Sequence, residues 1–266
     1  MKLSLFLKNI LNSFVFAFTM LTIIPLPGKK RIFSPQEISV SAVFFPLLGA
    51  FYGLTAIIGI LFFNLFSIST RISAVFIMIL FYGLNCFLHL DGLADVLDAF
   101  LPDKDKSSRL IIMKGSQIGS FALGGVILAL LLKYVLLTEL LYTGTVYYIF
   151  LVPVISRTAM AACAFLTVYP RLAGTGKHLI GNISLSTFLI TVFFCLLICI
   201  IYTFFSGSNF WPLFAKISLI SAGGAGCALF MAGWSSKKIG GATGDVLGAV
   251  NETTEIIGLF IALVLK

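Results

Sequence analysis

Long runs of apolar residues constrain the fold of this chain more than any other sequence feature. A helix that crosses a bilayer needs about 20 mostly apolar residues. Because 59% of the 266 residues are hydrophobic and only 11% are charged, the chain has too little polar surface to cover a soluble globule. We therefore predict an all-α, polytopic membrane helix bundle with six to eight spans, of which the first and last are the least clearly marked. The eight runs extend roughly from Leu11 to Leu26, Val40 to Phe66, Ile72 to Leu88, Ile118 to Leu137, Val146 to Val168, Ile183 to Phe205, Pro212 to Trp234 and Ile256 to Leu265.

The basic residues are distributed unevenly between the two sides of the predicted bundle. If each run crosses once, the loops after the first, third, fifth and seventh runs hold eleven of the eighteen Lys and Arg residues, so we expect that side to face the cytoplasm. Lys2 and Lys8 conflict with this scheme, unless the first segment lies in the membrane interface or re-enters. The net charge of +8 follows from the same bias and from anionic lipids, and no pattern of basic and aromatic residues suggests a nucleic acid partner. The eleven residues are Lys29, Lys30, Arg31, Lys104, Lys106, Arg109, Lys114, Arg171, Lys177, Lys237 and Lys238.

Two short clusters contain six of the ten carboxylates. Ionisable groups at bilayer depth are costly, so such clusters indicate a functional site. Helical offsets of four and seven, and of seven and ten, place each cluster on one helix face. Clustered carboxylates repel one another unless a cation lies between them, and oxygen ligands favour magnesium, manganese or calcium. We predict one shared metal site at the cytoplasmic face, rather than a solvated helix end where the acids of the first cluster pair with Lys104 and Lys106. The clusters are Asp91, Asp95 and Asp98, and Asp245, Glu252 and Glu255.

Small residues accompany both clusters. We expect Gly92, beside Asp91, to let a phosphate ligand approach the backbone. The glycine-rich segment 240–244, which includes Thr243 and Gly244, predicts a loop that presents N–H groups and a helix N-terminus to phosphate oxygens. Gly248 would keep the same face open, although its spacing from the earlier glycines is also typical of a helix-packing seam.

Two further polar residues in apolar surroundings are candidates. Arg157 lies within a span and needs a partner, which is either a carboxylate such as Glu252 or Asp98, or a substrate phosphate. His89 precedes the first cluster and is compatible with a structural or a substrate-binding role. The five cysteines lie in apolar runs without a C-x-x-C pair, which predicts packing residues and neither a disulfide nor a zinc site.

Several motifs together resemble one enzyme family. HLDGLADVLDAF, IMKGSQIGS, the Ser-Arg pair at 156–157 and GGATGDVLGAVNE occur in this order, with FTMLTIIPLP and FFPLLGA before them, and they cover nearly the whole chain. They resemble cobalamin synthase, the adenosylcobinamide-GDP ribazoletransferase family. The resemblance implies a magnesium-dependent, multi-pass enzyme of a bacterial or archaeal cytoplasmic (inner) membrane. Such an enzyme joins α-ribazole, or its 5′-phosphate, to adenosylcobinamide-GDP and releases GMP.

The chain departs from this family pattern in one region. Ile111 and Gly115 stand where the pattern has acids, Gln117 stands where it has a basic residue, and Ala99 replaces a glycine. These departures put a second metal or phosphate contact in doubt.

The chemistry of diphosphate cleavage suggests roles for the candidates. Asp91, Asp95 and Asp245 are the leading metal ligands, and Asp98 is the next candidate, either for metal binding or for accepting a proton. Residues 1–266 would then form a single integral membrane catalytic domain, whose partners are the bilayer and the corrinoid and ribazole substrates; a homo-oligomer is left open. Candidates for clamping phosphates are Lys114, Arg157, Lys237 and Lys238, and His89, Gly92, Thr243, Gly244 and Glu252 are further candidate substrate contacts.

Two alternatives are less consistent with the sequence. A CDP-alcohol phosphatidyltransferase also sets aspartates around magnesium, but its D-x-x-D-G-x-x-A-R pattern is broken here by Leu88 and Asp95. A cation-coupled transporter would use paired broken helices near the membrane midplane, whereas both acidic clusters start at one face.

Overall fold

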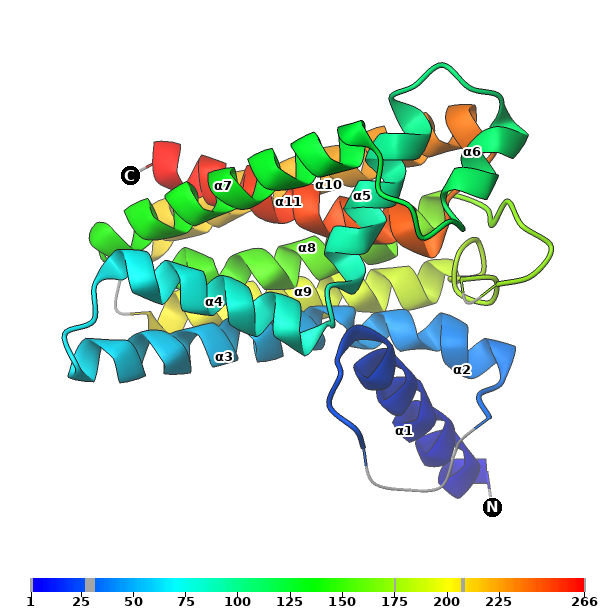
Figure 1. Ribbon diagram of the computed structural model, residues 1–266. Helices are drawn as coiled ribbons and strands as arrows, with labels where there is room; N and C mark the ends of the chain where they lie inside the picture. Colours follow the sequence, from blue (N-terminus) through cyan, green and yellow to red (C-terminus); the bar gives the residue numbers. More distant parts are fainter. Residues whose placement is uncertain (1, 27–31, 175, 207–208, 266) are drawn as a thin grey trace.

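The computed structural model describes residues 2–26, 32–174, 176–206 and 209–265, and within these residues it contains helices and no strand (Figure 1). This confirms the predicted all-α class. The α-helices are α1 (Lys2–Leu21), α2 (Pro35–Val40), α3 (Phe45–Leu65), α4 (Thr70–Leu84), α5 (Leu88–Phe100), α6 (Lys106–Ile112), α7 (Ser120–Tyr142), α8 (Tyr147–Leu166), α9 (Leu185–Phe205), α10 (Phe210–Ile239) and α11 (Gly244–Val264), and a short 3-10 helix, Ser41–Phe44, joins α2 to α3.

Six helical segments in the described residues are long and apolar enough to cross a membrane, which confirms the prediction of a multi-pass bundle. The segments are Pro35–Leu65, Ser120–Tyr142, Tyr147–Leu166, Leu185–Phe205, Phe210–Ile239 and Gly244–Val264, and a bent α4–α5 pair would make a seventh. The predicted first span is not among them, because the apolar part of α1 is a shorter helix, Leu7–Leu21. Figure 1 shows α1 lying obliquely beside α2.

Helices α8 and α11 form the centre of the bundle. Helix α8 packs against α3, α9, α10 and α11, whereas α11 also packs against α5 and α7. Close approach of α3 to α8 requires small residues, since a Cβ atom on Gly53 would lie 2.9 Å from the Cα of Phe150. Large apolar side chains on the outer helices, such as Leu128 and Phe204, are exposed, as expected for a bundle that lies in lipid.

The predicted span Ile72–Leu88 is broken, because α4 ends at Leu84 and α5 leaves it at an angle of 86°. Cys86 and Phe87 occupy the left-handed region of backbone conformation, with φ of 51° and 60°. Two non-glycine residues rarely adopt this conformation in succession. The break is supported by a hydrogen bond from the Phe87 N–H to the Tyr82 carbonyl (2.9 Å). Cys86 is exposed, unlike the other four cysteines, so the expectation that it is a buried packing residue was wrong.

One end of the bundle gathers the connections that follow α5, α8 and α10, while the C-terminus lies at the opposite end (Figure 1). The turn between α10 and α11 is tied to the end of α8, because the Ala242 N–H donates to the Val168 carbonyl (2.9 Å). Asp105 begins α6 by accepting hydrogen bonds from Ser107 and Ser108, and these bonds hold the pKa of Asp105 below its ordinary value. The basic loops predicted to share one side therefore share one end, apart from Lys29, Lys30 and Arg31, which lie outside the described residues.

Candidate functional site

The two acidic motifs meet where α5 packs against α11. A Cβ atom on Gly92 would lie 2.6 Å from the backbone oxygen of Asp245, and one on Gly248 would lie 3.1 Å from the Cα of His89. Both glycines therefore let the helix backbones approach closely. For Gly248 this favours the helix-packing alternative, and for Gly92 the facing helix occupies the space where a Cβ atom would lie.

Asp91, Asp95 and Asp245 lie around this contact. Asp91 is exposed, while Asp95 and Asp245 are partly buried. The charges of Asp245 and Asp91 are close enough to act unfavourably on Asp95. Thr243 caps α11 and donates a hydrogen bond from its hydroxyl to Oδ2 of Asp245 (3.0 Å), which fixes that carboxylate at the first turn. The structure thus brings together carboxylates that are far apart in the sequence.

The carboxylates suit a hard divalent cation chemically, because their oxygens repel one another and are only partly neutralised. In the part of the chain that the structure describes, no group of three or more His, Cys, Asp and Glu side chains is already arranged to hold a metal ion. Binding would therefore require the side chains to turn toward a shared ion. We expect such movement to be easy for Asp91, which is exposed.

Asp98 has a different environment from the other aspartates. Its Oδ2 accepts a hydrogen bond from the Gly119 N–H (2.6 Å) and its Oδ1 accepts one from the Ala122 N–H (2.9 Å). These N–H groups at the start of α7 have no partner within the helix itself, and a negative charge is favourable at this position. The carboxylate thus anchors α7 to α5, which favours a positioning role for Asp98 over metal binding.

The three members of the second acidic cluster do not form one site, because Glu252 and Glu255 lie apart from Asp245. Glu252 and Glu255 are buried deeper along α11, where Lys133 of α7 pairs with both, at 2.6 and 2.9 Å. Arg157 pairs with Glu255 at 2.7 Å and lies over the ring of Tyr52. Arg157 thus has a carboxylate partner, but it is neither Glu252 nor Asp98. We call Lys133, Arg157, Glu252 and Glu255 the buried ion network.

The buried ion network is electrically balanced, with two positive and two negative side chains, each nearly inaccessible to solvent. Tyr82 of α4 adds a hydrogen bond to Oε2 of Glu252 (2.9 Å). The network therefore joins α4, α7, α8 and α11. Its burial among these helices favours a structural role for Arg157 and Glu252 over direct contact with substrate.

The remaining candidates differ in accessibility. His89 is buried, and its Nδ1 lies 3.3 Å from the Asn85 amide nitrogen, while no hydrogen-bond partner is described for its Nε2. Lys114 and Lys237 are exposed and Lys238 is partly exposed. Gly244 is exposed, and a Cβ atom there would meet nothing within 4 Å, so a ligand could approach the start of α11.

The glycine turn before Asp245 is a compact connection. Gly240 and Gly241 have φ of 81° and 151°, which side chains strongly disfavour. Since Ala242 donates to Val168, part of the backbone that the sequence assigned to phosphate is already used. A ligand would therefore meet backbone N–H groups at Gly244, at the start of α11, rather than in the turn itself.

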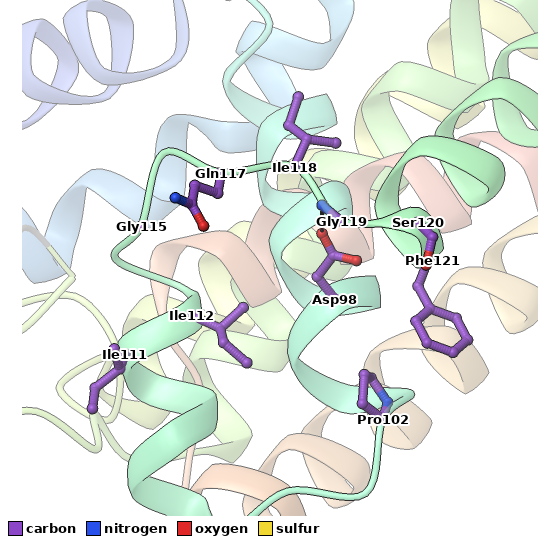
Figure 2. Close-up of a pocket in the computed structure, with 10 residues that line it drawn as sticks. All are labelled: Asp98, Pro102, Ile111, Ile112, Gly115, Gln117, Ile118, Gly119, Ser120 and Phe121. Carbon is purple, nitrogen blue, oxygen red and sulfur yellow. Dashed lines mark hydrogen bonds between the residues drawn. The ribbon is translucent and has the colours of Figure 1, made fainter.

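A cavity of about 450 Å³ adjoins the C-terminal end of α5, near Asp98 and Pro102. Figure 2 shows its lining: the segment with Gly115, Gln117 and Ile118 arches beside α5, and the Asp98 carboxylate points at Gly119. A second cavity, of about 220 Å³, contains Asp91 and shares Ile118 with the first. Ile111, Gly115 and Gln117, the positions that depart from the family pattern, all line the first cavity.

Two arginines near the site were not among the predicted site residues. Arg171 follows α8, and its guanidinium lies 3.8 Å from Oδ2 of Asp245. Arg109 of α6 is buried and donates to the carbonyls of Ala99 and Phe100 (2.6 and 3.1 Å), at the end of α5. In the sequence, both arginines could be recognised only as members of basic loops. The sequence does not show which residue of such a loop turns toward the aspartates.

Replacing Gly92 with alanine is expected to push α5 away from α11 and to destabilise the protein by about 1–3 kcal/mol. The added methyl group would meet backbone atoms, which cannot rotate aside. Thermal melting in detergent measures the effect. Gly124→Ala on α7 is the matched control, since its Cβ would meet nothing within 4 Å. An unchanged melting temperature for Gly92→Ala would contradict the close helix contact.

Comparisons with known proteins agree with this picture. The model of the cobalamin-5-phosphate synthase family matches residues 13–263. A protein of Chlorobium phaeobacteroides named adenosylcobinamide-GDP ribazoletransferase is 32% identical over 95% of this chain and 99% of its own length. Proteins with the same name from Syntrophobacter fumaroxidans and Clostridioides difficile are 34% and 31% identical, over 91% and 94% of this chain and 94% and 96% of their own lengths. No solved structure matches the chain.

Proposed function

Because the chain belongs to the cobalamin-5-phosphate synthase family, we propose that it joins α-ribazole, or its 5′-phosphate, to adenosylcobinamide-GDP and releases GMP. The observation that carries this proposal is the match over residues 13–263, which includes both acidic motifs. The relatives named adenosylcobinamide-GDP ribazoletransferase align with this chain over almost their whole length, which supports the same activity for it.

The reaction is a phosphoryl transfer. A ribazole hydroxyl oxygen attacks the phosphorus on the cobinamide side of the diphosphate and gives up its proton to water. The bond from this phosphorus to the bridging oxygen breaks, and GMP leaves with that oxygen. We place the diphosphate at the exposed start of α11, beside Gly244. The adjoining cavities, of about 450 and 220 Å³, offer space for part of the large corrinoid.

We propose that Asp91, Asp95 and Asp245 hold Mg²⁺. Their like charges and oxygen donors support this choice. A bound magnesium ion would neutralise the charge that develops on the leaving phosphate. Thr243 keeps the Asp245 carboxylate in place through its hydrogen bond, and Asp98 holds the start of α7 beside the site.

The rival functions are less well supported. The family match spans the chain, and no relative reported above bears a phosphatidyltransferase or transporter name. For a protein of a bacterial inner membrane, the gathering of basic loops at one end favours a cytoplasmic location of the site.

The direct test uses purified protein in lipid, incubated with adenosylcobinamide-GDP, α-ribazole and magnesium. Release of GMP together with formation of a cobalamin is the expected result. A parallel reaction with a CDP-activated lipid and an alcohol acceptor tests the phosphatidyltransferase alternative. Nucleotide monophosphate release only in the lipid reaction would overturn the proposal.

Changing Gly115 to aspartate is expected to lower the magnesium requirement or to raise turnover about tenfold, which corresponds to about 1.4 kcal/mol in the transition state. The family resemblance places an acid here, and Gly115 lines the cavity beside Asp98. A Cβ atom would lie 3.3 Å from the Ile112 carbonyl oxygen, so a side chain fits with a small adjustment. Magnesium titrations of the parent, Gly115→Asp and the uncharged Gly115→Asn measure the effect. Equal magnesium dependence in all three would show that no ligand is missing at this position.

A further inference from the structure

The diphosphate of the proposed substrate needs a cation in the site, and several of the described cations are held elsewhere. Lys133 and Arg157 are committed to the buried ion network. Arg109 is buried and directed at carbonyl groups at the end of α5. In the described ranges, Arg171 is the Lys or Arg residue that forms an ion pair with one of the clustered aspartates.

The contacts of Arg171 are long. Its guanidinium lies 3.8 Å from Asp245 and donates to the carbonyls of Leu110 and Met113 at 3.5 and 3.3 Å. By comparison, Lys133 and Arg157 make ion pairs of 2.6 to 2.9 Å in the buried network. Charge-assisted hydrogen bonds in proteins are normally about 2.7–2.9 Å long. The present partners of Arg171 therefore hold it weakly.

Arg171 also retains unused hydrogen-bonding capacity. Its Nε atom is buried and has no hydrogen-bond partner among the described residues. The side chain is 16% exposed and the Asp245 side chain is 27% exposed, so a ligand can reach this pair. A guanidinium presents parallel N–H groups that match two oxygens of one phosphate group.

We propose that Arg171 is a phosphate-binding residue of the site and exchanges its loose contact with Asp245 for the diphosphate of the substrate. This inference rests on the proposed function, because the site must take a diphosphate ester. Before substrate arrives, Arg171 offsets part of the negative charge of Asp245. Once the phosphate draws the guanidinium away, the Asp245 carboxylate, still held by Thr243, loses its positive neighbour and is available to a cation. The phosphate-clamping role that was one of two alternatives for Arg157 is thus proposed for Arg171.

The test compares Arg171→Gln and Arg171→Lys with the parent in lipid nanodiscs. GMP binding is measured by calorimetry with magnesium present, and KM for adenosylcobinamide-GDP and kcat are measured separately. Arg171→Gln is expected to weaken GMP binding and raise KM by about tenfold to a hundredfold, since one charged hydrogen-bonded contact is lost. Arg171→Lys keeps the charge but loses the paired donors, so its GMP affinity and KM should lie between those of the parent and of Arg171→Gln. Lys177→Gln, which removes an exposed positive charge from the same loop, is the matched control and should bind GMP as the parent does.

The outcomes separate the possible roles. Unchanged GMP affinity and KM in Arg171→Gln would overturn the proposal, including the case in which kcat alone falls, because Arg171 would then only brace the loop. An equal loss in Lys177→Gln would also overturn it, since general positive charge would suffice. If Arg171→Gln fails to fold, parental GMP affinity and KM in Arg171→Lys would count against paired donation, and a loss would support it. If the parent binds GMP through Arg171 but makes no cobalamin, the proposed function fails and the phosphate site stands.

Discussion

Replacing Asp95 or Asp245 with asparagine is expected to lower turnover by at least about 10²–10³-fold, while the protein still inserts and folds. Asparagine keeps the size of the side chain but removes a charge that would hold the cation and stabilise the transition state electrostatically. Steady-state release of GMP at saturating magnesium measures the effect. Asp103→Asn, in the exposed segment after α5, is the control and should retain parental turnover.

The substitution that lowers turnover is not expected to lower the stability of the protein. Asp95 is partly buried and lies near the like charges of Asp245 and Asp91, so Asp95→Asn removes both a buried charge and its repulsion in the protein without metal. Its melting temperature in a chelator should equal or exceed that of the parent, as expected where a site trades stability for function. Near-normal turnover in both variants would mean that the carboxylates are structural. A large fall in melting temperature would point to the same conclusion.

Removing Lys133 is expected to destabilise the protein by about 3–5 kcal/mol, the usual effect of breaking a buried ion pair. Lys133→Met leaves Glu252 and Glu255 with Arg157 as their one positive partner in the buried ion network. An uncompensated carboxylate in a membrane bundle has little access to water. The fraction of monodisperse protein after extraction, and its melting temperature, report the loss.

A compensating double variant distinguishes charge balance from packing. Lys133→Met combined with Glu252→Gln restores neutrality and leaves the pair of Arg157 and Glu255 intact. We expect it to recover most of the stability lost in the single variant. If the double variant is as unstable as Lys133→Met, the packing of the lysine stem rather than its charge is what the fold requires.

Helices were predictable from the sequence where hydropathy alone decides them. The apolar runs correctly indicated the spans that became α7, α8, α9 and α10. The break after Leu84 was not predictable, because no proline occurs there and its left-handed residues, Cys86 and Phe87, are types that usually avoid this conformation. Contacts across the break, such as that of Asn85 with His89, support the bend instead.

The site was predictable to the extent that local helical spacing determines it. Spacing indicated that Asp91 and Asp95 share a face, and their convergence with Asp245 was an inference from topology. Spacing alone placed Glu252 on the same face as Asp245, but it could not reveal that Lys133 lies opposite and neutralises it. The ion pair of Arg171 with Asp245 likewise depends on how the segment after α8 folds. Ion pairs between distant segments leave no periodic pattern in the sequence, so this pair could not be predicted.

The sharp bend between α4 and α5 has a consequence for how water meets the acidic row. Had α5 continued along α4, Asp91 and Asp98 would differ by about 10 Å in depth, given a rise of about 1.5 Å per residue. Because α5 turns by 86°, it runs across the bundle axis (Figure 1), and the row of aspartates stays near one level along that axis. If the bundle axis follows the membrane normal, the aspartates of α5 lie at a similar depth, so a large substrate would meet them together without descending along the helix.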